Sequence, residues 1–170
     1  MRTAYRIRQV LQYLTARPQP GEMAQAMSCL TSAERALFLQ LPVADQSHSL
    51  RVWSALSRAG ESDRDLLAAA LLHDIGKLRY RLHLWERVLI VLARKLVPGW
   101  VERIGSGSAR GWRRPFAVSV QHAEWGSDML AATQSNPRTI EIVRWHQGPI
   151  ERARTTKRQI RALQAADNES

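Results

Sequence analysis

Hydrophobic residues recur every three or four positions along most of the chain, which is the spacing of an amphipathic helix. Near the N-terminus these positions are Ile7, Val10, Leu11 and Leu14. The Pro-Gln-Pro-Gly sequence at 18–21 is expected to end this first helix. Thr31 and Glu34 have the spacing of a capping box, which predicts a short helix that stops before Pro42.

The same spacing predicts further helices through the rest of the chain. Their expected ranges are 44–59, 62–76, 84–96, 115–133, 137–147 and 150–166. Gly60 closes the first of these, and Ser62 is the expected N-cap of the next. Residues 99–111 are rich in glycine, serine and arginine and are expected to form a loop. This loop is either a lid over a site or, the interpretation that we favour, an ordinary surface excursion.

The pattern as a whole predicts an all-α, single-domain helical bundle. Neither the alternation typical of a β-strand nor an internal repeat occurs over a useful length. A chain of 170 residues has the size of one domain. Within it we expect residues 1–42 to form an N-terminal helical extension, packed on a core domain that comprises residues 43–170.

Charge and composition narrow the classes of function. The chain has 25 Lys+Arg against 15 Asp+Glu, and only three of the basic residues are lysines. Because a guanidinium group suits phosphate geometry, phosphate-bearing partners are favoured, although an arginine-rich proteome would give the same balance. An apolar fraction of 45% excludes a disordered chain. The single cysteine, Cys29, excludes a disulfide framework and fits a reducing cytosol.

Membrane insertion and export are not expected. The most apolar stretch, residues 88–93, is six residues long, whereas a helix that spans a bilayer needs roughly 20. The first residues carry dispersed charges and lack a small-residue cleavage site, so the expected location is cytoplasmic. Trp85, Trp100 and Trp112, with their basic neighbours, are candidates for a patch that binds a membrane surface or nucleic acid. We favour the interpretation that these residues belong to an ordinary solvent-exposed surface, and we do not expect nucleic acid as a partner.

The five histidines are the strongest candidates for chemistry. They are His48, His73, His83, His122 and His146. His83 is expected to be structural or solvent-facing, whereas His73 stands out because Asp74 follows it directly. Adjacent helical positions point about 100° apart, so both reach one ion only if other helices complete its coordination. Imidazole with carboxylate suits Fe, Mn, Zn or Mg rather than a soft-metal thiolate site.

The sequence Ala-Leu-Leu-His-Asp-Ile-Gly-Lys at 70–77 resembles the HD superfamily of metal-dependent phosphohydrolases, in which HDIGK is among the most specific strings. Three later segments are similar to its dinuclear, HDIG-type branch. They are 121–126, similar to the HxxxG helix, 142–146, similar to the next histidine helix, and 162–167, similar to the final ligand motif. The resemblance spans residues 48–167 and implies an all-helical fold, as the periodicity does independently.

The resemblance also implies a centre with two divalent metal ions, Fe, Mn, Mg or Zn, bridged by Asp74. The implied ligands are His48, His73, Asp74, His122, His146 and Asp167. His48, His73 and Asp167 would complete the coordination of one ion, and the two remaining histidines that of the other. Two such ions about 3.5–4 Å apart make hydroxide available near neutral pH and clamp the phosphoryl oxygens of a substrate.

The expected function is therefore hydrolysis of a phosphomonoester, a phosphodiester or a nucleoside polyphosphate by metal-bound hydroxide, with a nucleotide as the expected substrate. The resemblance implies that Lys77 contacts a substrate phosphate and acts with Asp74 in catalysis. Arg144 lies about half a turn from His146 and is the second expected phosphate contact. The sequence neighbours considered as hydrogen-bond acceptors for the ligating rings are Asp45, Glu124 and Asp128.

Departures from the family pattern limit the substrate. Gln147 stands where the cyclic-di-GMP phosphodiesterase subgroup has a second histidine, and the GYP signature is missing after Pro149, so cyclic-di-GMP is not expected. The single later histidine is closer to the bacterial diadenosine-tetraphosphate hydrolases of the superfamily. Two alternatives stay open: a non-catalytic HD-type sensor that binds a nucleotide or an ion, and an arginine-rich nucleic-acid module. The presence of all six ligands argues against the sensor.

Overall fold

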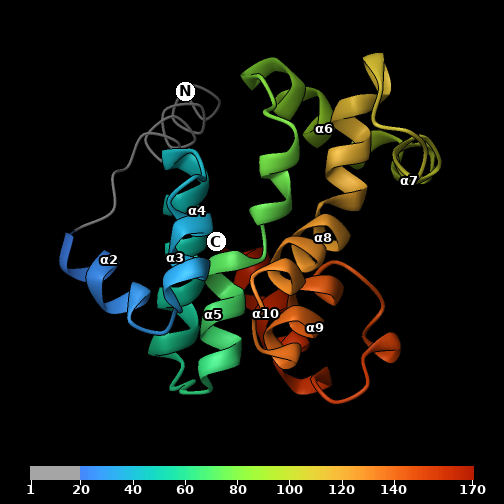
Figure 1. Cartoon of the computed structure of the whole chain (residues 1–170). Coiled ribbons are helices and arrows are strands. Elements are labelled where there is room, and N and C mark those ends of the chain that lie inside the picture. The colour runs from blue at the N-terminus through green and yellow to red at the C-terminus, as the bar shows by residue number, and fades with distance from the viewer. Residues whose placement is uncertain (1–19) are drawn as a thin grey trace, which may run out of the picture.

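The computed structural model describes residues 20–170, and every regular element in that part of the chain is a helix (Figure 1). The α-helices are α2 (Pro20–Met27), α3 (Ser32–Phe38), α4 (Val43–Arg58), α5 (Arg64–Leu72), α6 (Leu84–Leu96), α7 (Pro98–Gly105), α8 (Arg114–Ala132), α9 (Pro137–Trp145) and α10 (Lys157–Glu169). Short 3-10 helices are η1 (Ile75–Arg79), η2 (Gly111–Arg113) and η3 (Ile150–Arg152). The all-α prediction is confirmed; the helix expected around residues 7–14 lies outside the described residues.

Local sequence signals place several helix starts correctly. At α3 the backbone N–H of Glu34 donates to Thr31 Oγ1 at 3.3 Å, and the Thr31 N–H donates to Glu34 Oε2 at 2.8 Å. The predicted capping box is therefore confirmed. The N-cap of α5 is Asp63 rather than Ser62, because Asp63 Oδ1 accepts from the N–H groups of the two residues after Arg64.

At two places a proline that was expected to end a helix instead begins one. Proline is well tolerated in the first turn of a helix, because the N–H group that it lacks would have no partner there. Residues 20–21 were expected only to end a helix, but Pro20 begins α2. Pro98 likewise begins α7, so residues 99–105 are helical and the expected loop shrinks to the segment around 106–110. The expectation of a 99–111 loop is therefore wrong.

Two predicted helices are also not continuous α-helices. The range 62–76 stops at Leu72 and continues as η1. The range 150–166 divides into η3 and α10, because Glu141 accepts hydrogen bonds from the N–H groups of Arg154 and Thr155 and from Thr156 Oγ1. A side chain from a neighbouring helix thus holds the backbone in a turn that local periodicity does not signal.

The hydrophobic core surrounds α5, whose Leu66, Leu71 and Leu72 are fully buried. α5 packs against α4, α9 and α10, and α8 crosses η1 and α9 (Figure 1). The crossing is close: a Cβ on Gly76 would meet the carbonyl oxygen of His122 at 1.9 Å. α7 packs against the N-terminal half of α8, where a Cβ on Gly105 would overlap Val120. α6 and α7 therefore lie apart from the core, toward one end of the molecule.

The described part of the expected extension packs on this core. Ala26, Leu30 and Phe38 are buried in the same cluster as the leucines of α5. The boundary between 42 and 43 stays a prediction, since no observation tests it. Among residues 20–170 no helix is both long and apolar enough to cross a membrane.

Candidate metal centre

The six implied ligands come from five α-helices and the turn that follows α5. His48 lies on α4, His122 on α8 and Asp167 on α10, while His73 and His146 are the C-caps of α5 and α9. Asp74 follows His73 and precedes η1. Residues that are far apart in the sequence therefore converge on one place in the core.

The end of α5 explains how His73 and Asp74 face the same place. Asp74 has φ −97° and ψ 1°, so the chain leaves the α-helix at this residue. Two neighbours inside a continuous helix would point about 100° apart. Ending the helix between them removes that restriction, and Asp74 is then 1% exposed beside the rings from α5 and α8.

Two groups of potential ligand atoms share Asp74. His48, His73 and Asp74 have ligand atoms within 4.8 Å of one another, and so do Asp74, His122 and His146. Asp167 joins the first group, because its Oδ1 lies 2.8 Å from His48 Nε2 and 3.7 Å from His73 Nε2. The structure thus brings together all six residues named from the sequence.

Backbone carbonyl groups orient three of the rings. The Nδ1 atoms of His73, His122 and His146 lie 2.9, 2.9 and 2.7 Å from the carbonyl oxygens of residues 70, 118 and 143. A carbonyl oxygen only accepts, so each Nδ1 carries the proton and each Nε2 offers its lone pair to the centre. Each of these rings therefore has an acceptor, and it is not one of the carboxylates considered from the sequence. Asp45 binds Arg87 instead, and Asp128 binds Arg144.

The atoms left without partners fit a bound cation. Among the described residues, the Nε2 atoms of His73, His122 and His146 and the Oδ1 of Asp74 are buried and have no hydrogen-bond partner. His122 Nε2 lies 3.3 Å from Asp74 Oδ1, with a lone pair on each atom and no proton between them. Buried acceptors that face each other are costly unless a positive charge compensates them. Nitrogen and carboxylate oxygen donors suit a divalent transition metal.

The protonation states also suit metal binding. Burial lowers the pKa of His146 to about 3, with help from the neighbouring histidines. Burial likewise lowers the pKa of His73, against the opposite effect of Asp74. Burial alone would raise the pKa of Asp74, but the Lys77 ammonium holds that pKa well below its usual value. His73 and His146 are therefore neutral and Asp74 is ionised at neutral pH, as metal ligands must be.

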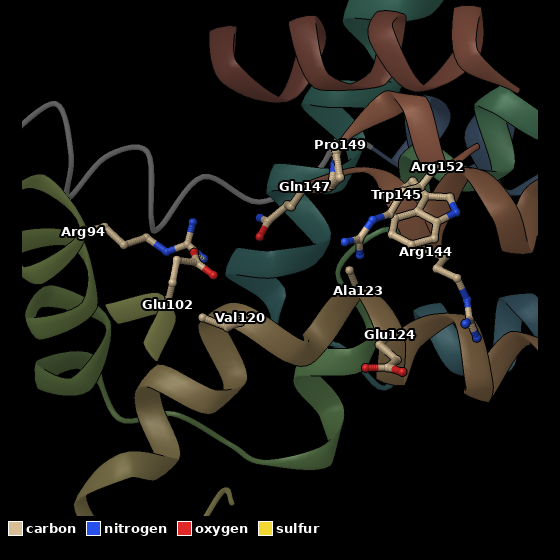
Figure 2. A pocket seen from close by; sticks show the side chains of 11 residues that line it. Arg94, Glu102, Val120, Ala123, Glu124, Arg144, Trp145, Gln147, Pro149 and Arg152 are labelled. Carbon is tan, nitrogen blue, oxygen red and sulfur yellow. Dashed lines mark ion pairs between the residues drawn. The ribbon is translucent and has the colours of Figure 1, made fainter. Parts of the chain in front are cut away.

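Two hollows reach the ligand residues from the surface. One of about 260 Å³ is lined by Lys77, Arg94 and His122, and another of about 270 Å³ is lined by Arg94, His146 and Asp167. Gln147 lines both of them. A third hollow, of about 380 Å³, continues outward from Arg94 and Gln147, which approach each other from α6 and from the turn after α9 (Figure 2).

Arg94 is the site residue that sequence reasoning missed. Its Nε donates to Ser119 Oγ and its Nη2 to the Ser119 carbonyl oxygen, both at 2.7 Å. Ser119 precedes His122 by almost one turn of α8, so the guanidinium is held beside a ligand helix. Arg87 and Arg94 are seven residues apart and therefore share one side of α6, but that spacing alone does not relate Arg94 to the centre.

Of the two basic residues named from the sequence, Lys77 lies at the centre and Arg144 lies farther out. Lys77 Nζ is 2.5 Å from Asp74 Oδ2, which places an ammonium at the centre itself. Arg144 lines the outer hollow (Figure 2). Its Nη2 lies 3.1 Å from Asp128 Oδ1. His83 is the exposed N-cap of α6, as the expectation of a structural or solvent-facing role required.

Helices that bring histidines and aspartates together around Asp74 fit the class of metal-dependent hydrolases. The family model of the HD domain matches residues 46–170, and the chain belongs to the HD-domain family. HD domains bind divalent metal ions, and the clustered histidines and aspartates fit that property. No curated protein and no solved structure matches the chain.

Proposed function

We propose that this HD domain is a phosphohydrolase with two divalent ions, which hydrolyses a phosphomonoester, a phosphodiester or a nucleoside polyphosphate. The observation that carries the proposal is the sharing of Asp74 between two ligand groups. The ions supply Lewis acidity, which lowers the pKa of water and neutralises charge on phosphoryl oxygens. His48, His73 and Asp167 would hold one ion, His122 and His146 would hold the other, and the Asp74 carboxylate would contribute to both sites.

Positive side chains at the inner hollow support a phosphate-bearing substrate. Lys77 and Arg94 line the hollow that reaches His122. The Lys77 ammonium at Asp74 is on a flexible stem and can turn to a substrate phosphate, which is the catalytic and binding role that we assign to it. Ser119 fixes the Arg94 guanidinium, which makes Arg94 the better positioned of the two for bidentate binding.

The outer hollow suits the remainder of a larger substrate. Arg144 and Arg152 line it together with Trp145, and the Arg152 guanidinium lies 5.6 Å from the Trp145 ring centre (Figure 2). An aromatic face beside guanidinium groups suits a base and its phosphates. We therefore propose a nucleotide as substrate, with Arg144 contacting a group remote from the bond that breaks.

The test combines metal content with turnover. The full chain is purified without chelator or nickel affinity, and metal per chain is measured by mass spectrometry beside Asp167→Ala. Glu169→Ala is the control, because it removes an exposed carboxylate from the same helix end. We expect close to two ions in the wild type and in the control, and fewer in Asp167→Ala.

The same preparations are then assayed with Mn²⁺ or Fe²⁺ on 4-nitrophenyl phosphate, bis(4-nitrophenyl) phosphate and nucleoside polyphosphates. Turnover that falls with the metal content of Asp167→Ala supports the proposal. Metal binding with tight nucleotide binding and no product would favour the non-catalytic sensor. Failure to bind Mn²⁺, Fe²⁺ or Zn²⁺ would overturn the metal centre and the hydrolase together.

A further inference from the structure

α6 presents its hydrophobic side to solvent. Of its 13 residues only Glu86 and Ala93 are buried. The exposed large apolar residues of α6 are Leu84, Trp85, Val88, Leu89, Val91, Leu92 and Leu96, with exposed fractions from 39% to 74%. At about 100° per residue they cover an arc of roughly 160°. This arrangement is the reverse of the usual surface helix, which turns its apolar stripe toward the core.

Polar contacts join the opposite side of α6 to the rest of the molecule. Both nitrogens of the Arg87 fork bind the Asp45 carboxylate on α4, at 2.6 and 2.8 Å. Glu86, which is 2% exposed, accepts from Arg114 at 2.7 Å. Arg94 is held by Ser119, as described above. The orientation of α6 is therefore set by specific contacts, and they keep the apolar arc outward.

The apolar arc continues onto the two elements that follow. Trp100 on α7 and Trp112 on η2 are 43% and 61% exposed, and their rings stack with centres 6.1 Å apart. Trp85 and Leu89 line a shallow hollow of about 530 Å³ together with these two rings. We call this surface the tryptophan face. It consists of the seven exposed apolar residues of α6 with Val97, Trp100 and Trp112.

The segment that carries the tryptophan face is strongly basic. Residues 81–114 hold eight of the 25 lysines and arginines and only two of the 15 acids. The exposed cations of this segment are Arg81, Arg94, Lys95, Arg103, Arg110 and Arg113. Lys95 lies within the apolar arc itself, and the Arg113 guanidinium lies 5.4 Å from the Trp112 ring centre.

We propose that the tryptophan face binds the surface of a membrane that contains anionic lipids. Leucine and valine side chains enter the boundary between headgroups and acyl chains, tryptophan prefers that boundary, and the surrounding cations meet the negative headgroups. The chain then lies on the bilayer, in keeping with the finding that none of the helices in residues 20–170 can span one. This proposal does not depend on the hydrolase activity.

Charge complementarity favours a lipid surface over other occupants. In a symmetric dimer through this face, the basic residues of both copies would face each other and repel. Nucleic acid would pair with the cations but would leave the exposed leucines and valines in water without gain. An anionic bilayer surface satisfies both kinds of side chain at once.

The test measures co-sedimentation of the full chain with phosphatidylcholine vesicles, with and without phosphatidylglycerol. Leu92→Glu is compared with Leu39→Glu, because the two leucines are 51% and 52% exposed and Leu39 lies outside the tryptophan face. We expect binding to the anionic vesicles that Leu92→Glu weakens about tenfold or more and Leu39→Glu leaves unchanged. Lys95→Gln should weaken binding to anionic vesicles severalfold without creating or removing binding to neutral ones.

Circular dichroism and metal content check that each variant keeps its fold. Both should be unchanged, because Leu92 and Leu39 are exposed and neither belongs to the candidate metal centre. Absence of binding to anionic vesicles overturns the proposal. Equal losses in Leu92→Glu and Leu39→Glu also overturn it. A wild-type dimer that Leu92→Glu converts to monomer assigns the face to a second copy, and duplex DNA binding that survives Leu92→Glu, without vesicle binding, assigns it to nucleic acid.

Discussion

α5 and α6 are both rich in aliphatic residues, yet they sit in this protein in opposite ways. α5 buries six of its nine residues, whereas α6 buries two of thirteen. α5 packs against α4, α9 and α10 and ends at the first residue of the His-Asp pair. α6 contacts α8 through Glu86 and Arg94, and its buried Ala93 packs in a small apolar cluster with α7 and α8. Apolar composition alone therefore does not decide which helix forms the core.

The comparison separates two uses of hydrophobic surface. Around α5 the apolar side chains exclude water and fix the ligand rings, so that an ionised carboxylate and neutral imidazoles can exist together in a buried site. On α6 the apolar side chains contribute little to folding and are available to an external surface. Changes near α5 should accordingly affect stability and chemistry, and changes on the exposed side of α6 should affect neither.

The largest expected effect is at the bridging carboxylate. Asp74→Asn keeps the shape of the side chain but removes the charge that both ligand groups share, so activity should fall by about 1,000-fold or more and metal content should drop. Glu169→Gln is the matched control, since it also removes the charge of a carboxylate without changing its shape, but at an exposed position. Steady-state kinetics with metal analysis of both variants tests this. Full activity in Asp74→Asn would contradict the assignment of the centre.

The next effect concerns the crossing of η1 and α8. In Gly76→Ala the new methyl group would meet the His122 carbonyl oxygen and the Gly126 nitrogen, so one element must move. The free energy of unfolding should fall by about 2–4 kcal/mol. Gly99→Ala on α7 has nothing within 4 Å of the new methyl group and should change stability by less than about 1 kcal/mol. Urea denaturation of both variants measures the difference, and similar values would break the comparison.

A third prediction concerns pH. The folded pKa of His146 is about 3, below the ordinary value of 6.5, so the unfolded chain binds a proton that the folded chain does not. The metal-free protein should therefore lose stability as pH falls below 6.5, by about 2 kcal/mol between about pH 7 and about pH 5. His73 adds in the same direction.

Urea unfolding of the chelated protein at the two pH values measures this loss, and His146→Gln should reduce it. Glu86 on α6 behaves differently in that range. Burial tends to raise its pKa, but Arg114 and the His83 N–H hold the pKa below 4.5, so its contribution persists until the pH is lower still. Stability that is constant or rises between about pH 7 and about pH 5 would contradict the burial of a neutral His146.

The smallest effect is expected on the exposed arc of α6. Leu92→Ala should change the free energy of unfolding by less than about 0.5 kcal/mol, because Leu92 is 51% exposed. Leu71→Ala, at a fully buried position of α5, should cost about 2–5 kcal/mol. Thermal or urea denaturation of this pair tests the comparison most directly. A large loss in Leu92→Ala would mean that α6 belongs to the core.

The sequence predicts the helices well where their own residues determine them. α6 begins and ends where expected, and the capping box of α3 forms. Where distant residues determine the backbone, prediction fails: Glu141 holds the break before α10, and no local pattern signals it. Pro98 was expected only to end a helix before a loop, but it also begins α7.

In the candidate site, too, some features could be predicted from the sequence and others depend on how distant segments pack. The six candidate ligands could be named because the family resemblance supplies them, and the structure brings these residues together, while their role as ligands stays a prediction. Their orientation could not be named, because backbone carbonyl groups provide it. Arg94 was missed because its relation to the centre passes through Ser119 on another helix, a contact that depends on how α6 and α8 pack.

The carbonyl groups that orient the ligand rings have a consequence for how this site changes over evolution. At residues 70, 118 and 143 the acceptor belongs to the main chain, so replacement of the side chain leaves it in place. Those positions are free to drift among residues that fit the core without disturbing the tautomer of a neighbouring histidine. Mutation can therefore disable the centre through its six ligands more readily than through the groups that aim them, which makes the arrangement durable under sequence divergence.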